Sequence, residues 1–119
     1  MSEVNSVDFK EMTMNDYQYL AGGFIAFEDN MYPVLALAEE AGEVLGKFAK
    51  LARGDETYAK MSKAEFDEVL IKELGDVLFN IAALCTTRSI SLDYVSNENI
   101  RKLLDRKNRN VIKGDGDNR

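Results

Sequence analysis

Apolar residues recur at helical spacing in four segments of this chain, and no segment shows the sustained alternation that is typical of strands. The pattern predicts helices over four ranges, namely 14–27, 32–53, 63–88 and 92–109. Short connections between helices favour antiparallel neighbours. We therefore predict an all-α fold, an up-down four-helix bundle in a single domain over 1–119, with a main loop at 54–61 and flexible ends at 1–12 and 111–119.

Local signals mark the ends of these segments. Residues typical of N-caps come directly before three of them, and these are Thr13, Ser62 and Ser91. Glu65 follows the second of these caps at capping-box spacing, and Pro33 stands in the favoured first turn of its helix. Gly54 is placed to supply a left-handed C-cap, whereas Gly22-Gly23 weakens the helical preference of the first segment.

Acidic residues crowd one side of the second predicted helix, at Glu39, Glu40 and Glu43. Like charges one turn apart repel by a few tenths of a kcal/mol. On a helical wheel, Glu40 and Glu43 lie nearest the apolar arc and face the predicted bundle interior, while Glu39 lies at the outer edge. An ExxE pair taken alone is more typical of a solvated helix face.

The third predicted helix is less ordinary, because Glu73, Asp76 and Asn80 share one face amid apolar neighbours. A buried, unpaired carboxylate costs several kcal/mol or takes up a proton. For Glu73 and Asp76 taken alone, a solvated helix face and a functional site are about equally favoured. On antiparallel neighbours, however, Glu40 and Glu43 would meet them at one point, as in metal sites built inside helix bundles.

The composition excludes most other kinds of site. The chain has no histidine, which excludes Ser-His-Asp and Cys-His catalysis and His-liganded metals, and it lacks the GxxxxGK[ST] and GxGxxG nucleotide motifs. Oxygen-only ligation selects a hard cation, Mg²⁺ or alternatively Mn²⁺. The single Cys85 lies in an apolar stretch and is expected to be a small core side chain.

Charge and hydropathy limit the partners. A net charge of -6 and a pI near 4.7 argue against a nucleic acid polymer. A small polyphosphate is still a possible ligand of such an acidic protein, because a bound divalent cation makes the local electrostatic potential positive. No apolar run approaches the ~20 residues that span a bilayer, and the first residues carry no apolar signal segment. We therefore expect a cytoplasmic protein with no membrane partner.

The string YPVLALAEEAGEVLGK followed by KELGDVLFNIAAL resembles the MazG-like branch of the all-α nucleoside triphosphate pyrophosphohydrolases, whose pattern is EExxE, a gap and ExxD. The ending RKLLDRKNRNVIKGDGDNR is similar to the basic tail of small single-domain members from bacteria and phages. The resemblance implies that Glu40, Glu43, Glu73 and Asp76 bind Mg²⁺. Glu39 and Glu40 would be the catalytic pair, with Glu39 an outer-shell group or the one that orients or deprotonates water.

The implied reaction is hydrolysis of a nucleoside triphosphate to the monophosphate and pyrophosphate. Cationic residues are expected to contact the phosphates, and these are Lys47, Lys50, Lys107, Arg109, Lys113 and Arg119. An ion pair with Glu43 is an equally favoured role for Lys47. The ordinary alternative for the tail is a frayed end, and the functional one is that it folds over the polyphosphate, including that of a neighbouring subunit.

Two polar residues complete the predicted substrate site. Asn80 is expected to hydrogen-bond the sugar or a metal-bound water. Gln18, with Tyr17 and Phe24, is a candidate for contacts to the base, although aromatic residues at helical spacing are more often core.

Both inner helices are apolar over more than one stripe, so we expect another subunit to cover them. The resemblance implies a homodimer or tetramer. Two alternatives stay open at this point. One is a phosphoribosyl-ATP pyrophosphohydrolase, and the other is a non-catalytic acidic helical module that dimerises.

Overall fold

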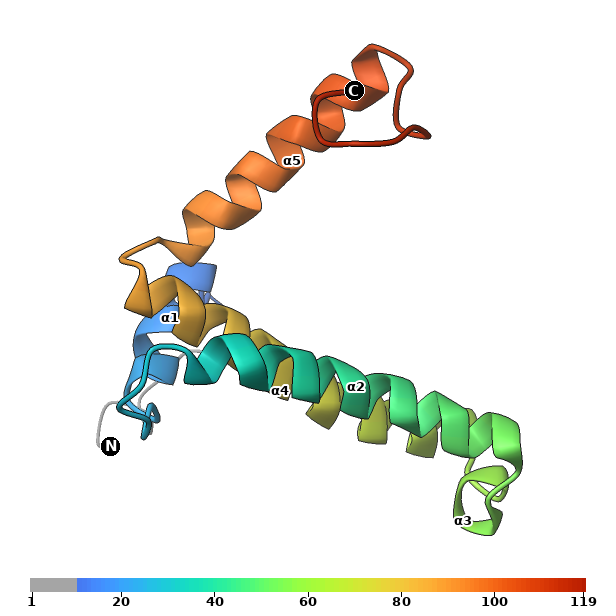
Figure 1. Ribbon diagram of the computed structural model, residues 1–119. Coiled ribbons are helices and arrows are strands. Elements are labelled where there is room, and N and C mark those ends of the chain that lie inside the picture. The colour runs from blue at the N-terminus through green and yellow to red at the C-terminus, as the bar shows by residue number, and fades with distance from the viewer. Residues whose placement is uncertain (1–10) are drawn as a thin grey trace.

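The structure is a computed structural model that describes residues 11–119, and the regular secondary structure in that range is entirely helical (Figure 1). The all-α prediction is confirmed. The helices are α1 (Met14–Gly22), α2 (Tyr32–Arg53), α3 (Glu56–Ala59), α4 (Lys63–Thr87) and α5 (Leu92–Asn108). Most of the predicted flexible start, 1–12, lies outside the described residues. None of the described helices is long and apolar enough to cross a membrane.

The two long helices, α2 and α4, lie side by side as an antiparallel hairpin (Figure 1). The rings of Phe48 and Phe66 meet edge to face with centroids 5.2 Å apart, which pairs the end of α2 with the start of α4. Gly54 ends α2 in the left-handed region at φ 80°, as its position predicts, and Pro33 occupies the first turn. A glycine suits this cap because it has no Cβ to strain.

The predicted loop at 54–61 contains a short helix, α3, which corrects the prediction. The N–H of Ala59 donates to the carbonyl of Asp55 at 2.9 Å, and one such turn is enough to form α3. The Tyr58 ring lies 6.4 Å from the ring of Phe66 and so covers the tip of the hairpin. Contact with the hairpin therefore stabilises α3, which the short sequence segment did not predict by itself.

The predicted N-caps are confirmed. Thr13 and Ser62 each accept from the backbone N–H three residues on, and both form full capping boxes. Ser91 caps α5 in the same manner. The end of α1 was predicted wrongly, because the helix ends at Gly22 rather than near Phe27. The two consecutive glycines, Gly22-Gly23, lose the most backbone entropy in a helix, and α1 stops there.

A small core lies where α1, the end of α4 and the start of α5 meet. Its buried members are Ala21, Ala82, Cys85 and Leu92. Tyr17 packs against this cluster, so the ordinary interpretation of Tyr17 as a core residue is confirmed. Cys85 is buried, as predicted.

Two side chains of α1 hold the start of α5. The amide of Gln18 donates to the carbonyl of Ile90 at 2.9 Å and accepts from the N–H of Leu92 at 2.8 Å. Asn15 accepts from the N–H of Asp93 at 2.9 Å. Because the first N–H groups of a helix lack partners inside the helix, these contacts attach α5 to α1 at its first turn.

Beyond this joint, α5 projects away from the α2–α4 hairpin (Figure 1). The radius of gyration is 17.6 Å, compared with about 13–14 Å for a compact domain of this length. The four predicted helices are present, although α1 is shorter than predicted, and one chain does not close them into a compact bundle.

Replacing Gln18 by Ala should lower the free energy of unfolding by about 1–3 kcal/mol, because it leaves the N–H of Leu92 without its acceptor. Urea denaturation followed by circular dichroism measures this change. Asn97→Ala, on the exposed side of α5, is the control and should leave stability unchanged or slightly raised. Equal stability of Gln18→Ala and the wild type would contradict the proposed joint.

Candidate active site

Carboxylates from two helices meet near the middle of the hairpin. Glu40 of α2 and Glu73 and Asp76 of α4 each offer one oxygen atom, and these three atoms all lie within 4.8 Å of one another. Glu73 and Asp76 share a face because they are three residues apart on a helix. Glu40 and Glu73 are partly buried, and Asp76 is exposed. The structure thus brings together three of the four acids that were predicted to share a cation.

The geometry and chemistry of these three acids fit a small divalent cation. Oxygen ligands on opposite sides of Mg²⁺ lie about 4.2 Å apart, given bonds of 2.0–2.1 Å. The observed limit of 4.8 Å is therefore within a small side-chain adjustment of a coordination sphere. An all-oxygen donor set also selects Mg²⁺ or Mn²⁺ over softer metals.

The other two glutamates of α2 lie at the edge of this cluster. The side chain of Glu43 is 52% exposed, and its carboxylate is 4.0 Å from the Lys47 ammonium. Glu39 is exposed to solvent. The roles of Glu43 as a fourth ligand and Glu39 as a catalytic group stay predictions.

Electrostatic repulsion converges on Glu40. Burial raises the pKa of this carboxyl above its ordinary value of 4.5, and the carboxylates of Asp76, Glu39, Glu73 and Glu43 raise it further. Each neighbour disfavours the ionised form because like charges repel. The four other acids singled out from the sequence therefore all repel the charge of Glu40, and a cation there would relieve the repulsion.

Lys47 connects the two helices beside the cluster. Its ammonium lies 3.2 Å from Glu73 Oε1 and 4.0 Å from Glu43, so the contact across the hairpin is the shorter one. The hydrogen bond to Glu73 is the main cause that raises the pKa of Lys47. The sequence indicated only the pair with Glu43, because a contact between helices depends on their register.

Three other residues of the hairpin and α1 that were predicted to contact the substrate make contacts within the chain instead. The ammonium of Lys50 is 5.6 Å from the centroid of the Tyr58 ring, toward the hairpin tip. Asn80 is buried, and its amide donates to the backbone carbonyl of Asp76 at 3.0 Å. The amide of Gln18 is engaged at the joint between α1 and α5. Substrate contacts by these three residues stay predictions.

The cations at the C-terminus lie near the far end of α5, which points away from the hairpin (Figure 1). Arg109 pairs with Asp105 at 2.7 Å, and Arg119 donates to backbone carbonyls of the tail. Lys107 and Lys113 are exposed. Within one chain, the structure does not bring these four residues to the carboxylate cluster.

One anchor of the tail was not foreseen from the sequence. Arg106 of α5 is 5% exposed, and its guanidinium lies 3.2 Å from the carboxylate of Asp117. Lys102, one turn earlier, is 3.4 Å from the same carboxylate. Hydrogen bonds from Arg106 and Lys102 lower the pKa of Asp117. The spacing of four residues between Lys102 and Arg106 was the available signal, and the fold of the tail supplied the partner.

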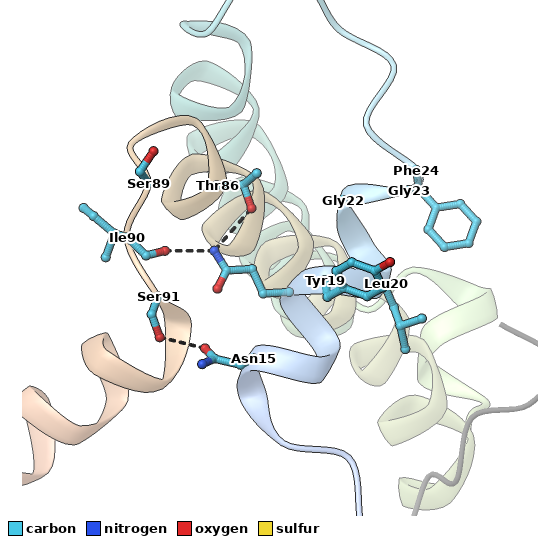
Figure 2. Close-up of a pocket in the computed structure, with 11 residues that line it drawn as sticks. Asn15, Tyr19, Leu20, Gly22, Gly23, Phe24, Thr86, Ser89, Ile90 and Ser91 are labelled. Carbon is cyan, nitrogen blue, oxygen red and sulfur yellow. Dashed lines mark hydrogen bonds between the residues drawn. The ribbon is translucent and has the colours of Figure 1, made fainter. Parts of the chain in front are cut away.

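A separate pocket of about 730 Å³ lies at the joint of α1, α4 and α5 (Figure 2). Its lining carries no charged side chain and comprises Asn15, Gln18, Tyr19, Leu20, Gly22, Gly23, Phe24, Thr86, Ser89, Ile90 and Ser91. Thr86 is ten residues beyond Asp76 on α4, which corresponds to about 15 Å along the helix. The carboxylate chemistry is therefore outside this pocket.

Comparison with known proteins identifies the family to which this chain belongs. Residues 30–111 match the family described as the MazG nucleotide pyrophosphohydrolase domain. The Gene 37 protein of Mycobacterium phage L5 is 36% identical over 99 residues, which cover 83% of this chain and 84% of that protein. No solved structure shows a significant match. The chain belongs to the MazG nucleotide pyrophosphohydrolase domain family.

Replacing Glu40 by Gln should stabilise the metal-free protein at neutral pH. The folded-state pKa of Glu40 lies above its ordinary value of 4.5, so the group favours folding below pH 4.5. That contribution is lost as the pH rises from about 4.5 through the folded-state pKa. In EDTA, the stability of Glu40→Gln relative to the wild type should therefore increase from pH 4 to pH 7.

Urea denaturation across this pH range measures the effect. Glu68→Gln removes an exposed charge from α4 and is the matched control, with a smaller dependence on pH. A stability difference for Glu40→Gln that stays constant from pH 4 to pH 7 would show that repulsion does not act on this group.

Proposed function

We propose that this protein is a Mg²⁺-dependent pyrophosphohydrolase that converts nucleoside or deoxynucleoside triphosphates to monophosphates and so adjusts nucleotide pools. The observation that carries the proposal is the convergence of Glu40, Glu73 and Asp76 from two helices. Membership of the MazG family supports nucleotide pyrophosphohydrolase chemistry. Glu43, at the edge of the cluster, is the proposed fourth ligand.

The proposed reaction balances without a covalent intermediate. The oxygen of water forms a bond to the α-phosphorus, and the bond from that phosphorus to the α–β bridging oxygen breaks. Pyrophosphate leaves with the bonding electrons. When bound, Mg²⁺ would supply charge neutralisation and activation of water. The proton of the water passes to a carboxylate of the chain.

The exposed carboxylate of Glu39 is the proposed base. It is adjacent in sequence to Glu40, and its exposure gives access to water. Its charge also reaches Glu40, because it contributes to the raised pKa of that group. A positioned general base contributes about 100-fold or more to the rate. Lys47, which is already at the cluster, is the proposed contact for the triphosphate.

We propose that the active form is a homo-oligomer, with a homodimer as the minimal unit. Ile100, Leu103 and Leu104 form an apolar stripe on α5, and they are 56%, 40% and 54% exposed. Leu45 and Leu74 of the hairpin are also exposed, at 70% and 52%. A second copy that covers these surfaces would complete the helix bundle.

The same arrangement would account for the basic tail. Within one chain, α5 directs its end away from the hairpin (Figure 1). In a dimer, Lys107, Arg109, Lys113 and Arg119 of one copy would approach the triphosphate bound by the other. Positive charge there would favour binding of the phosphates and stabilise the leaving pyrophosphate.

Purified protein should release pyrophosphate from at least one member of a panel of NTPs and dNTPs when Mg²⁺ is present, and EDTA should abolish the release. Glu73→Ala should lower kcat/KM at least about 100-fold, because a ligand to the cation is lost. Glu68→Gln, on the exposed side of α4, is the control and should retain activity.

The panel should include phosphoribosyl-ATP, because preferential cleavage of that compound would assign the protein to the related activity. No pyrophosphate from any substrate, or equal release by Glu73→Ala and the wild type, would exclude the enzymatic proposal and leave a non-catalytic helical module.

Light scattering coupled to size-exclusion chromatography should give at least twice the chain mass of 13.4 kDa for the wild type. The double variant Ile100→Glu/Leu104→Glu should be monomeric, because it places two charges in the proposed interface. Ile100→Leu/Leu104→Met keeps the surface apolar and should keep the wild-type mass. A monomeric wild type would contradict the proposed assembly.

A further inference from the structure

The ammonium of Lys47 lies at the edge of the carboxylate cluster and is largely enclosed. The side chains of Lys47 and Glu73 are only 14% and 19% exposed, and their charged atoms are 3.2 Å apart. A second carboxylate, from Glu43, is 4.0 Å away. The ion pair therefore joins α2 to α4 at the point where Glu73 also faces Glu40 and Asp76.

No other cation within residues 11–119 forms an ion pair with the three clustered acids, Glu40, Glu73 and Asp76. Lys50, three residues further along α2, lies over the ring of Tyr58 instead. The cluster thus has several negative charges and one fixed positive charge. That positive charge partly offsets the repulsion among the acids.

We propose that Lys47 is the resident cation of the metal-free site, and that it moves off Glu73 when a divalent metal binds. This proposal rests on the function proposed above. Glu73 is both the partner of Lys47 and a member of the oxygen cluster that fits Mg²⁺. A dication and an ammonium on the same carboxylate repel each other, so each lowers the affinity of the site for the other.

The exchange would leave the ammonium of Lys47 free to contact the phosphates of the substrate. Once released from Glu73, the ammonium stays at the end of a side chain beside the cluster, and the phosphates of a nucleotide are the next available anions. Lys47 would thus join the two helices in the metal-free protein and bind the phosphates once the metal is present. Metal binding would thereby prepare the site for a triphosphate.

Removal of the charge gives the first test. Lys47→Met keeps most of the aliphatic length, and isothermal titration calorimetry with Mg²⁺ in the absence of nucleotide should show affinity about 10-fold tighter than the wild type, because one repelling charge is gone. The same variant in EDTA should melt at a lower temperature than the wild type, because Glu73 has lost its partner.

Two further variants separate this effect from a general change in charge or folding. Lys47→Arg keeps the charge and should bind Mg²⁺ within about 3-fold of the wild type. Lys72→Met removes an equal charge from the exposed residue next to Glu73 and should change the affinity much less than Lys47→Met, because exposed charges are screened. Circular dichroism confirms that each variant is folded.

Chemical labelling gives a second readout that does not involve activity. Acetic anhydride followed by mass spectrometry should modify Lys47 slowly in EDTA and at least about 3-fold faster with saturating Mg²⁺, because the ammonium loses its carboxylate partner. Labelling of Lys72 should not respond to Mg²⁺.

The outcomes distinguish this inference from the function on which it rests. If the wild type binds Mg²⁺ and Lys47→Met binds it more weakly, Lys47 orients Glu73 as a ligand and the exchange is wrong. Equal binding by the two proteins would also overturn the exchange. Metal-independent labelling of Lys47 would also overturn it. If the wild type binds no Mg²⁺ in the absence of nucleotide, the exchange is wrong, whereas the proposed function is decided separately by the release of pyrophosphate.

Discussion

Repulsion among the carboxylates that α2 and α4 bring together is the constraint that the site of this protein depends on. Glu40 shows it most directly, because burial and four neighbouring acids all raise its pKa. Such an arrangement costs stability unless a cation offsets the charge. Lys47 provides one such cation within the chain. The proposed metal would provide a stronger one, and the same negative charge that disfavours the metal-free hairpin is what would bind it.

Different helices hold the acids of the site and set the direction of α5. The hairpin of α2 and α4 holds the acids in register, and the caps at Ser62 and Gly54 define where its helices begin and end. The joint made by Asn15 and Gln18 fixes the direction of α5 instead. Because α5 leaves the hairpin, its apolar stripe and basic end are presented outward. Those features are consistent with a site that a second copy completes, as proposed above.

Much of the fold was predictable because its signals are local. Spacing of apolar residues located four helices, and the side chains of Thr13 and Ser62 marked the starts of two of them, α1 and α4, through hydrogen bonds that span three residues. The errors occurred where local preference is weak. Contact with the hairpin tip stabilised α3, and the Gly22-Gly23 pair ended α1 early. The site was partly predictable for the same reason, since the i,i+3 spacing of Glu73 and Asp76 places them on one face.

The sequence by itself determined the helical class, the acidic faces and the absence of histidine, all of which follow from residue type and periodicity. Only the tertiary structure decided which acids meet. The register of the antiparallel hairpin brought Glu40 to Glu73 and Asp76, and it gave Lys47 a closer partner in α4 than in its own helix. Contacts between helices depend on register and on the direction each helix takes, and neither is encoded within a single helical segment.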